Sequence, residues 1–172
     1  MKNSRTTYIV TSAVIAASYA ALTYFSAMLG MAYGSVQFRI SEALTILPIL
    51  TPAAIPGLAI GCFLGNLSSP YGIADILLGT LATFIAALLT RPLRKFRVRN
   101  IPFLAPLPAV LVNALIIGGE ITFFMGDEAS FTAFLFTAGT VAFGQFVVCY
   151  GLGLPLGIVL EKHSNRLTKQ HG

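Results

Sequence analysis

The 172-residue chain has few charged residues: Lys, Arg, Asp and Glu make up 10% of it, against about 25% in an average soluble domain. It has no tryptophan, two cysteines and two histidines. Hydrophobic residues make up 56% of the chain, and its mean hydropathy is +0.82. Apolar runs of about 20 residues, the length that crosses a bilayer, recur along it. We therefore expect an all-α integral membrane protein in which residues 1–172 form a single domain.

Several motifs of enzymes and cofactor-binding proteins are missing. The sequence has no G-x-x-x-x-G-K-[ST], so this chain is not expected to bind ATP through a P-loop. His163 and His171 lie in the polar tail, and no His, Cys and carboxylate set suggests a metal ion. Cys62 and Cys149 fall within apolar runs and are expected to be inert buried thiols. The sequence therefore predicts neither an enzyme nor a cofactor bound by this chain.

One apolar stretch, residues 41–67, is interrupted by Pro48, Pro52 and Pro56. These prolines are compatible with one kinked helix, two short helices or a re-entrant hairpin. The N-terminal apolar segment follows basic residues but lacks a clear cleavage site, so we expect it to be retained as a helix. Apart from residues 41–67, four segments are continuous enough to span a membrane, and the N-terminal segment is the first of them. They are residues 7–29, 73–90, 102–125 and 130–160.

The basic residues predict the topology. Ten of the eleven Lys and Arg residues lie in three clusters beside apolar segments, at residues 2–5, 91–99 and 162–169. Positive charge next to a span marks the cytoplasmic side. All three clusters reach that side if residues 41–67 cross the bilayer twice, or enter and leave on one face. We therefore expect six transmembrane helices in the cell membrane, both termini in the cytoplasm, and no nucleic-acid partner.

This topology brings polar side chains into the outer half of the membrane. A charge in hydrocarbon is costly, so an ionisable residue there is a candidate for function. Glu120 is the hardest to explain otherwise, because no Lys or Arg lies at its depth on another segment. The candidates for substrate binding are Arg39, Glu42, Asn66, Tyr71, Asp75, Asn113, Glu120 and Gln145.

Purely structural roles remain open for most of these residues. Arg39 and Glu42 are three residues apart and could pair with each other. Asp75 could cap a helix, and Asn66 could lie in a loop. The amides of Asn113 and Gln145 could instead join helices by hydrogen bonds.

Aromatic residues accompany the carboxylates and amides. Carboxylates accept paired N–H bonds, and aromatic rings offer stacking faces, so this combination suits a flat heterocycle with N–H donors. Asn113 and Glu120 are seven residues apart and share one helix face, about 10 Å apart along the axis. The aromatic residues expected to ring the pocket are Tyr19, Tyr24, Tyr33, Phe38, Tyr71, Phe123 and Phe124.

A stripe of small residues marks the first apolar segment. Ala13, Ala17 and Ala21 recur every fourth residue, flanked by Ala16 and Ala20. Such a stripe lets another helix approach closely. It indicates either a docking face for another membrane protein or internal packing.

Three stretches carry a resemblance to a known family: "VQFRISEALTILPILTPAAIPGLAIGCFLGNL" (residues 36–67), "YGIADILLGTLATFIAALLT" (71–90) and "PAVLVNALIIGGE" (108–120). Together they resemble the QueT family of substrate-binding (S) components of energy-coupling factor (ECF) transporters. The alanine stripe is similar to the A-x-x-x-A motif of S components. The resemblance implies six helices, a transmembrane coupling subunit as partner, and two cytoplasmic ATPases that use the ATP.

The resemblance also implies a substrate, namely a queuosine precursor. Candidates are queuine and the prequeuosine base, 7-aminomethyl-7-deazaguanine, a flat base with a cationic amine arm. Glu120 or Glu42 would accept the guanine-like N–H pair, and Asp75 would bind the amine. Gln145 departs from the acidic residue expected at its position, which affects the identity of the substrate. The alternatives are an S component for another vitamin or purine-like base, a self-sufficient oligomeric carrier, and a regulatory subunit.

Overall fold

The computed structural model describes residues 4–33, 36–99, 101–126 and 130–170. These described residues form six α-helices, one 3₁₀-helix and two π-helical turns, with no strand among them, which confirms the all-α expectation. In chain order the elements are α1 (Ser4–Met28), η1 (Ile40–Ile49), α2 (Ala54–Asn66), α3 (Ile73–Leu93), α4 (Leu107–Glu120), η2 (Ile121–Met125), α5 (Phe131–Val148), η3 (Cys149–Gly153) and α6 (Leu154–Gln170).

Within the part of the chain that the structure describes, four helical segments are long and apolar enough to cross a membrane. Each corresponds to one of the four continuous segments predicted from the sequence. The last runs through α5, η3 and α6, so η3, which contains two glycines, forms a π turn within this segment and does not end it. The four segments are Ser4–Met28, Ile73–Leu93, Leu107–Phe124 and Phe131–His163.

Residues 41–67 form two short helices instead of one kinked helix. η1 has 10 residues and α2 has 13, so at 2.0 and 1.5 Å per residue each is about 20 Å long. That is shorter than the hydrocarbon core of about 30 Å. Pro48 lies inside η1, and Pro52 lies in the turn between the helices. Because these two helices are short, the count of six spans stays a prediction.

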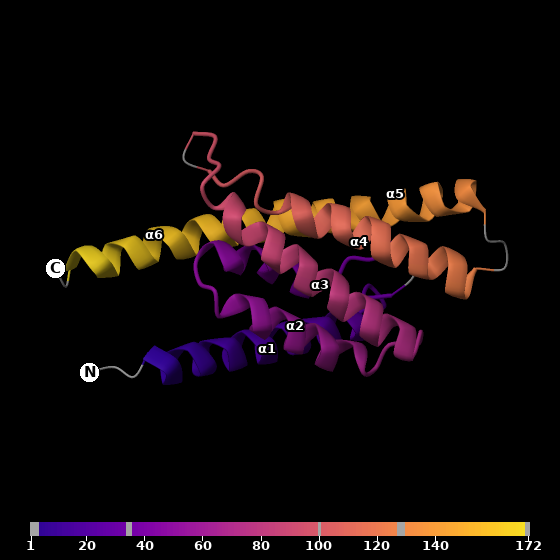
Figure 1. Cartoon of the computed structure of the whole chain (residues 1–172), viewed down its shortest axis with the longest axis horizontal. Coiled ribbons are helices and arrows are strands. Elements are labelled where there is room, and N and C mark those ends of the chain that lie inside the picture. The colour runs from indigo at the N-terminus through magenta and orange to yellow at the C-terminus, as the bar shows by residue number, and fades with distance from the viewer. Residues whose placement is uncertain (1–3, 34–35, 100, 127–129, 171–172) are drawn as a thin grey trace.

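The two termini lie at the same end of the elongated molecule (Figure 1). α2 and α4 run away from this end, and α3 and α5 run back toward it. Because the chain starts and ends at the same end, it passes along the molecule an even number of times, which is consistent with the predicted topology. The side of the membrane on which the termini lie stays a prediction.

Glycines on α2 allow it to approach α1 closely. Gly57, Gly61 and Gly65 are spaced by four residues and all face α1. A Cβ added to Gly61 would lie 2.7 Å from Cβ of Tyr19 and 2.8 Å from the carbonyl oxygen of Ala16. Small residues at such spacing bring helix backbones together. One face of α1 is therefore packed on α2.

η1 lies among the longer helices and contacts α1, α2, α3, α5, α6 and η3. Hydroxyl groups of α1 hold its first residues. Thr23 Oγ1 donates to Ser41 Oγ at 2.8 Å, and the backbone N–H of Ile40 donates to Ser26 Oγ at 3.0 Å. The position of η1 thus depends directly on α1.

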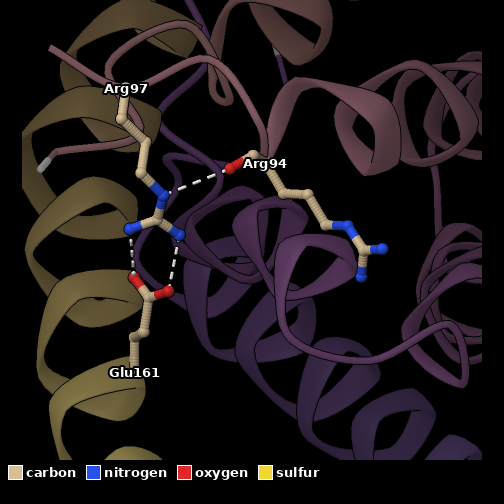
Figure 2. Close-up of polar contacts among 3 residues, drawn as sticks. All are labelled: Arg94, Arg97 and Glu161. Atoms are coloured by element: carbon tan, nitrogen blue, oxygen red, sulfur yellow. Dashed lines mark hydrogen bonds and ion pairs between the residues drawn. The ribbon is translucent and has the colours of Figure 1, made fainter.

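At the end that carries the termini, an ion pair joins the loop after α3 to α6 (Figure 2). Arg97 Nη1 and Nη2 donate to the Glu161 carboxylate at 3.0 and 2.5 Å, and Arg97 Nε donates to the carbonyl of Arg94 at 3.2 Å. The bidentate bond to Glu161 raises the pKa of Arg97 above its usual value. The pair fixes the loop to α6.

Candidate functional site

Seven of the eight predicted binding residues are buried, each at most 4% exposed. They come from η1 or the residue before it, α2, α3, α4 and α5. Burying charges in an apolar helical protein costs free energy unless each charge has partners. The hydrogen-bond partners therefore indicate what these side chains do. The seven are Arg39, Glu42, Asn66, Asp75, Asn113, Glu120 and Gln145.

Asn66 joins three elements. Arg39 Nη2, just before η1, donates a short hydrogen bond to Asn66 Oδ1. Asn66 Nδ2 in turn donates to the backbone carbonyl of Asp75 in α3 at 2.9 Å. Asn66 is the last residue of α2 and is fully buried. The alternative of a loop role for Asn66 was therefore wrong.

The carboxylate of Glu42 is bound by a residue of α1. The Tyr19 hydroxyl donates a short hydrogen bond to Glu42 Oε1. Arg39 and Glu42 attract each other electrostatically, but their hydrogen bonds go to Asn66 and Tyr19. The two charges are therefore not merely a local pair on one helix turn.

Asp75 does not cap α3. The N-cap residue is Gly72, whose φ of 70° suits a glycine. Asp75 lies in the first turn of the helix, and its buried Oδ2 has no hydrogen-bond partner within the described parts of the chain. The carboxylate is thus available to a group that the chain itself does not provide.

Five buried polar atoms of this cluster have no hydrogen-bond partner among the described residues: Arg39 Nε, Glu42 Oε2, Asp75 Oδ2, and both Oε1 and Oε2 of Glu120. Each unsatisfied atom costs about 1–3 kcal/mol, and natural proteins leave few of them. Glu120 interacts electrostatically with Asp75 and Arg39. Arg39 in turn interacts electrostatically with Glu42 and Asp75. Three carboxyl groups and one guanidinium therefore form one cluster that offers four acceptor atoms and one donor.

The other two buried amides, those of Asn113 and Gln145, mainly contact residues four positions away along their own helical segments. Asn113 Nδ2 donates to the Ala109 carbonyl at 2.9 Å. Gln145 Oε1 is 3.5 Å from Cys149 Sγ, which also lies 3.6 Å from the Glu42 carbonyl. The single Cys149 S–H can donate to either of these two oxygens, and its position places Gln145 near η1. Asn113 therefore does not make the hydrogen bond between helices that the sequence suggested, because its amide donates within α4.

Aromatic rings border the cluster on the Arg39 side. The Arg39 guanidinium carbon lies 5.9 Å from the centroid of the Tyr33 ring, and Tyr33 meets Tyr71 edge to face at 6.1 Å. The expectation for Phe123 and Phe124 was wrong, since these side chains are 56% and 73% exposed. η2 turns both rings toward the outside of the molecule.

Two features of the cluster had no clear signal in the sequence. Tyr19 was expected only as an aromatic wall, yet its hydroxyl binds Glu42. Cys62 accepts a hydrogen bond from Thr83 Oγ1 at 3.2 Å, beside Asn66. A hydroxyl or thiol inside an apolar run has no characteristic spacing, so only the helix packing reveals these contacts.

The alanine stripe faces outward. Ala13, Ala17 and Ala21 are exposed, whereas Ala16 and Ala20 are buried. Internal packing therefore accounts for the flanking alanines and not for the stripe. An outer groove of about 350 Å³ runs beside it, lined by Tyr8, Ile9, Ser12, Ala13, Ala16, Pro56 and Ile60. The stripe and the groove offer a narrow surface for another helix.

The helices describe a multi-pass membrane protein, and buried ionisable groups of this kind are typical of membrane transport proteins. The chain belongs to the QueT transporter family, whose model matches residues 9–162. This membership confirms the resemblance seen in the sequence and the expectation of a transporter in place of an enzyme.

A curated relative gives a narrower comparison. The chain is 36% identical over 85 residues to the protein named queuosine precursor transporter QueT from Lactococcus lactis subsp. cremoris (strain MG1363). The aligned part covers 49% of this chain and 50% of that relative, about half the length of each. No solved structure shows significant similarity to the chain.

Proposed function

We propose that this chain is the substrate-capture (S) component of an ECF-type uptake transporter for a queuosine precursor. The observation that carries the proposal is the cluster of five unpartnered polar atoms on Arg39, Glu42, Asp75 and Glu120. The name of the Lactococcus relative supports the substrate class. The prequeuosine base is the expected cargo, and queuine is the next candidate.

The donors and acceptors of the cluster match this base. A 7-deazaguanine has two adjacent N–H groups on one edge, a ring carbonyl, and in the prequeuosine base a protonated amine. Glu120, with both oxygens unpartnered, suits the adjacent N–H groups, because a carboxylate accepts such a pair in a bidentate manner. Asp75 Oδ2 then accepts from the amine, and Arg39 Nε donates to the ring carbonyl. Glu42 is the second acceptor for the N–H edge.

The charge of the cluster favours a cation. Three carboxylates and one guanidinium leave an excess of negative charge when all are ionised. A neutral base would leave that excess unmatched, which is costly where water is excluded. Tyr33 and Tyr71 border the site and offer ring faces or edges to a flat base.

The proposed location is the cell membrane, with both termini in the cytoplasm. The three basic clusters then lie on the cytoplasmic side, as the positive-inside rule requires. The buried cluster, at the other end of the helices, then lies toward the outside. The chain crosses six times, with η1 and α2 as the two short crossings.

The proposed partners are a transmembrane coupling subunit and two cytoplasmic ATPases, which use the ATP, while this chain itself carries no cofactor. The exposed stripe of Ala13, Ala17 and Ala21 and its adjoining groove form the docking face. A close approach there would bury small side chains against the backbone of a partner helix.

An uptake experiment tests the S-component proposal. Labelled prequeuosine base would be supplied to cells that make no queuosine precursor and that express the chain with or without the coupling subunit and ATPases. We expect binding to membranes in both strains and accumulation only with the complete set. Accumulation with the chain alone would instead identify a self-sufficient carrier.

A further inference from the structure

A second candidate binding site lies at the opposite end of the molecule, between the end of α3 and the start of α4. It is an outward-facing groove of about 330 Å³. Leu89 and Leu111, on its two sides, are 48% and 52% exposed. All of its lining side chains are apolar: Leu89, Pro92, Leu93, Leu107, Pro108, Leu111 and Val112. A groove with this lining on a membrane-spanning surface accommodates hydrocarbon and not a polar solute.

The loop that joins the two helices of this groove carries a concentration of positive charge. The loop from α3 to α4 begins at Arg94, next to the groove residue Leu93. No Asp or Glu occurs anywhere in residues 76–119, so this part of the chain cannot neutralise its own cations. Its basic residues are Arg91, Arg94, Lys95, Arg97 and Arg99.

These cations differ in how far the protein already satisfies them. Arg97 is bound by Glu161, and Arg91 Nη1 donates to the Pro48 carbonyl at 2.6 Å. The exposed Arg94 guanidinium and Lys95 ammonium have no partner among the described residues. Figure 2 shows the Arg94 side chain pointing away from both Arg97 and Glu161. Arg91 and Arg94 also repel each other, so an anion near Arg94 would relieve an unfavourable interaction.

We propose that this groove binds an anionic phospholipid, with one acyl chain against Leu89, Leu93 and Leu111 and the phosphate headgroup at Arg94 and Lys95. An apolar groove between two helices whose connecting loop is basic provides for both parts of such a lipid. Basic pockets between helices, on the side of the membrane where positive charge gathers, are typical of this recognition. The proposal requires that the chain spans a membrane but does not depend on the nature of its cargo.

The absence of tryptophan from the chain allows a direct test. A Leu111→Trp variant has one indole in the groove, and Leu77→Trp has one on the exposed surface at the other end of α3. Both would be reconstituted in phosphatidylcholine bilayers, and their fluorescence quenching by brominated phosphatidylglycerol or brominated phosphatidylcholine measured. We expect about thirtyfold stronger relative binding of phosphatidylglycerol at Leu111→Trp, from two lipid-attracting cations, and equal quenching at Leu77→Trp.

Charge variants complete the test. In the Leu111→Trp background, Arg94→Gln with Lys95→Gln should abolish the preference for phosphatidylglycerol. Arg5→Gln with Lys162→Gln removes the same net charge at the same end of the molecule and should preserve it. Equal quenching by both lipids at Leu111→Trp would overturn the proposal. A preference for phosphatidylglycerol that survives the loss of Arg94 and Lys95 would also overturn it. The same holds if neither brominated lipid quenches the fluorescence of the Leu111→Trp variant.

Discussion

The hydroxyl of Tyr19 in α1 donates a hydrogen bond to Glu42 Oε1 in η1. Tyr19 is fully buried and packs against α2, and the opposite face of α1 carries the exposed stripe of Ala13, Ala17 and Ala21. One helix therefore contacts the polar cluster on one side and offers a docking surface on the other. The arrangement gives the binding site and the proposed partner a common element.

Removing the Tyr19 hydroxyl should destabilise the protein. Tyr19→Phe leaves Glu42 Oε1 buried without a partner, which costs about 1–3 kcal/mol. Thermal unfolding in detergent measures the loss. Tyr24→Phe is the matched control, because the Tyr24 hydroxyl donates to the Leu64 carbonyl at 2.9 Å in an exposed setting. Equal effects of the two substitutions would contradict a special role for the Tyr19–Glu42 bond.

Adding one methyl group to Gly61 should force α1 and α2 apart. A Cβ at this position lies within 2.8 Å of Tyr19 Cβ and of the Ala16 carbonyl, neither of which is a flexible side-chain end. Overpacking of this kind costs about 1–3 kcal/mol, and Gly61→Ala should lower the melting temperature accordingly.

Gly139→Ala provides the control for that measurement. Gly139 lies in α5, and a Cβ there meets nothing within 4 Å. Since alanine is a better helix former than glycine by about 1 kcal/mol, this substitution should be neutral or stabilising. A melting temperature of Gly61→Ala at or above that of the unmodified chain would show that the α1–α2 contact is not tight.

A larger residue in the alanine stripe should separate binding from transport. Ala17 is exposed and its side chain does not reach the polar cluster, so Ala17→Leu should leave the affinity for substrate unchanged. A leucine there keeps a partner helix from close approach, and we expect uptake to fall about tenfold or more. A control substitution must lie on another helix and leave the packing intact. Ala138→Leu does not meet this condition, because Ala138 packs closely against Gly118.

Leu135→Ala is the appropriate control for the stripe, since Leu135 is 55% exposed on α5. It changes the size of an outward-facing side chain on a different helix and should affect neither binding nor uptake. Full uptake by Ala17→Leu would remove the stripe from the proposed interface.

The sequence predicted the long helices well, because four apolar segments of membrane-spanning length leave few alternatives. Residues 41–67 were ambiguous for a physical reason. Three prolines limit helix length there, but how the chain turns between them depends on the helices around it. The structure gives a 3₁₀-helix followed by an α-helix, and η1 owes its position to hydroxyls of α1, such as Thr23, that no sequence period reveals.

The burial of the candidate residues could also be predicted, because ionisable residues in apolar segments are rare and avoid lipid. Their partners could not. Asn66, at a helix end next to a polar loop, was a binding candidate for which the sequence also left a loop position open. Its contacts with Arg39 and Asp75 arise only when three elements meet. Phe123 was misassigned because the π turn of η2 changes the direction of the side chains at the end of α4.

Glu120 is the proposed acceptor for the cargo, and calorimetric titration of the purified protein with prequeuosine base tests this role. We expect tight binding by the unmodified chain. Glu120→Gln should bind at least about tenfold more weakly, because hydrogen bonds to a charged group are worth about 1.5–3 kcal/mol. Glu161→Gln, which loses a carboxylate only at the other end of the molecule, should bind normally. Undiminished binding by a folded Glu120→Gln variant would rule out Glu120 as the acceptor, and no binding by the folded unmodified chain would rule out this base as the cargo.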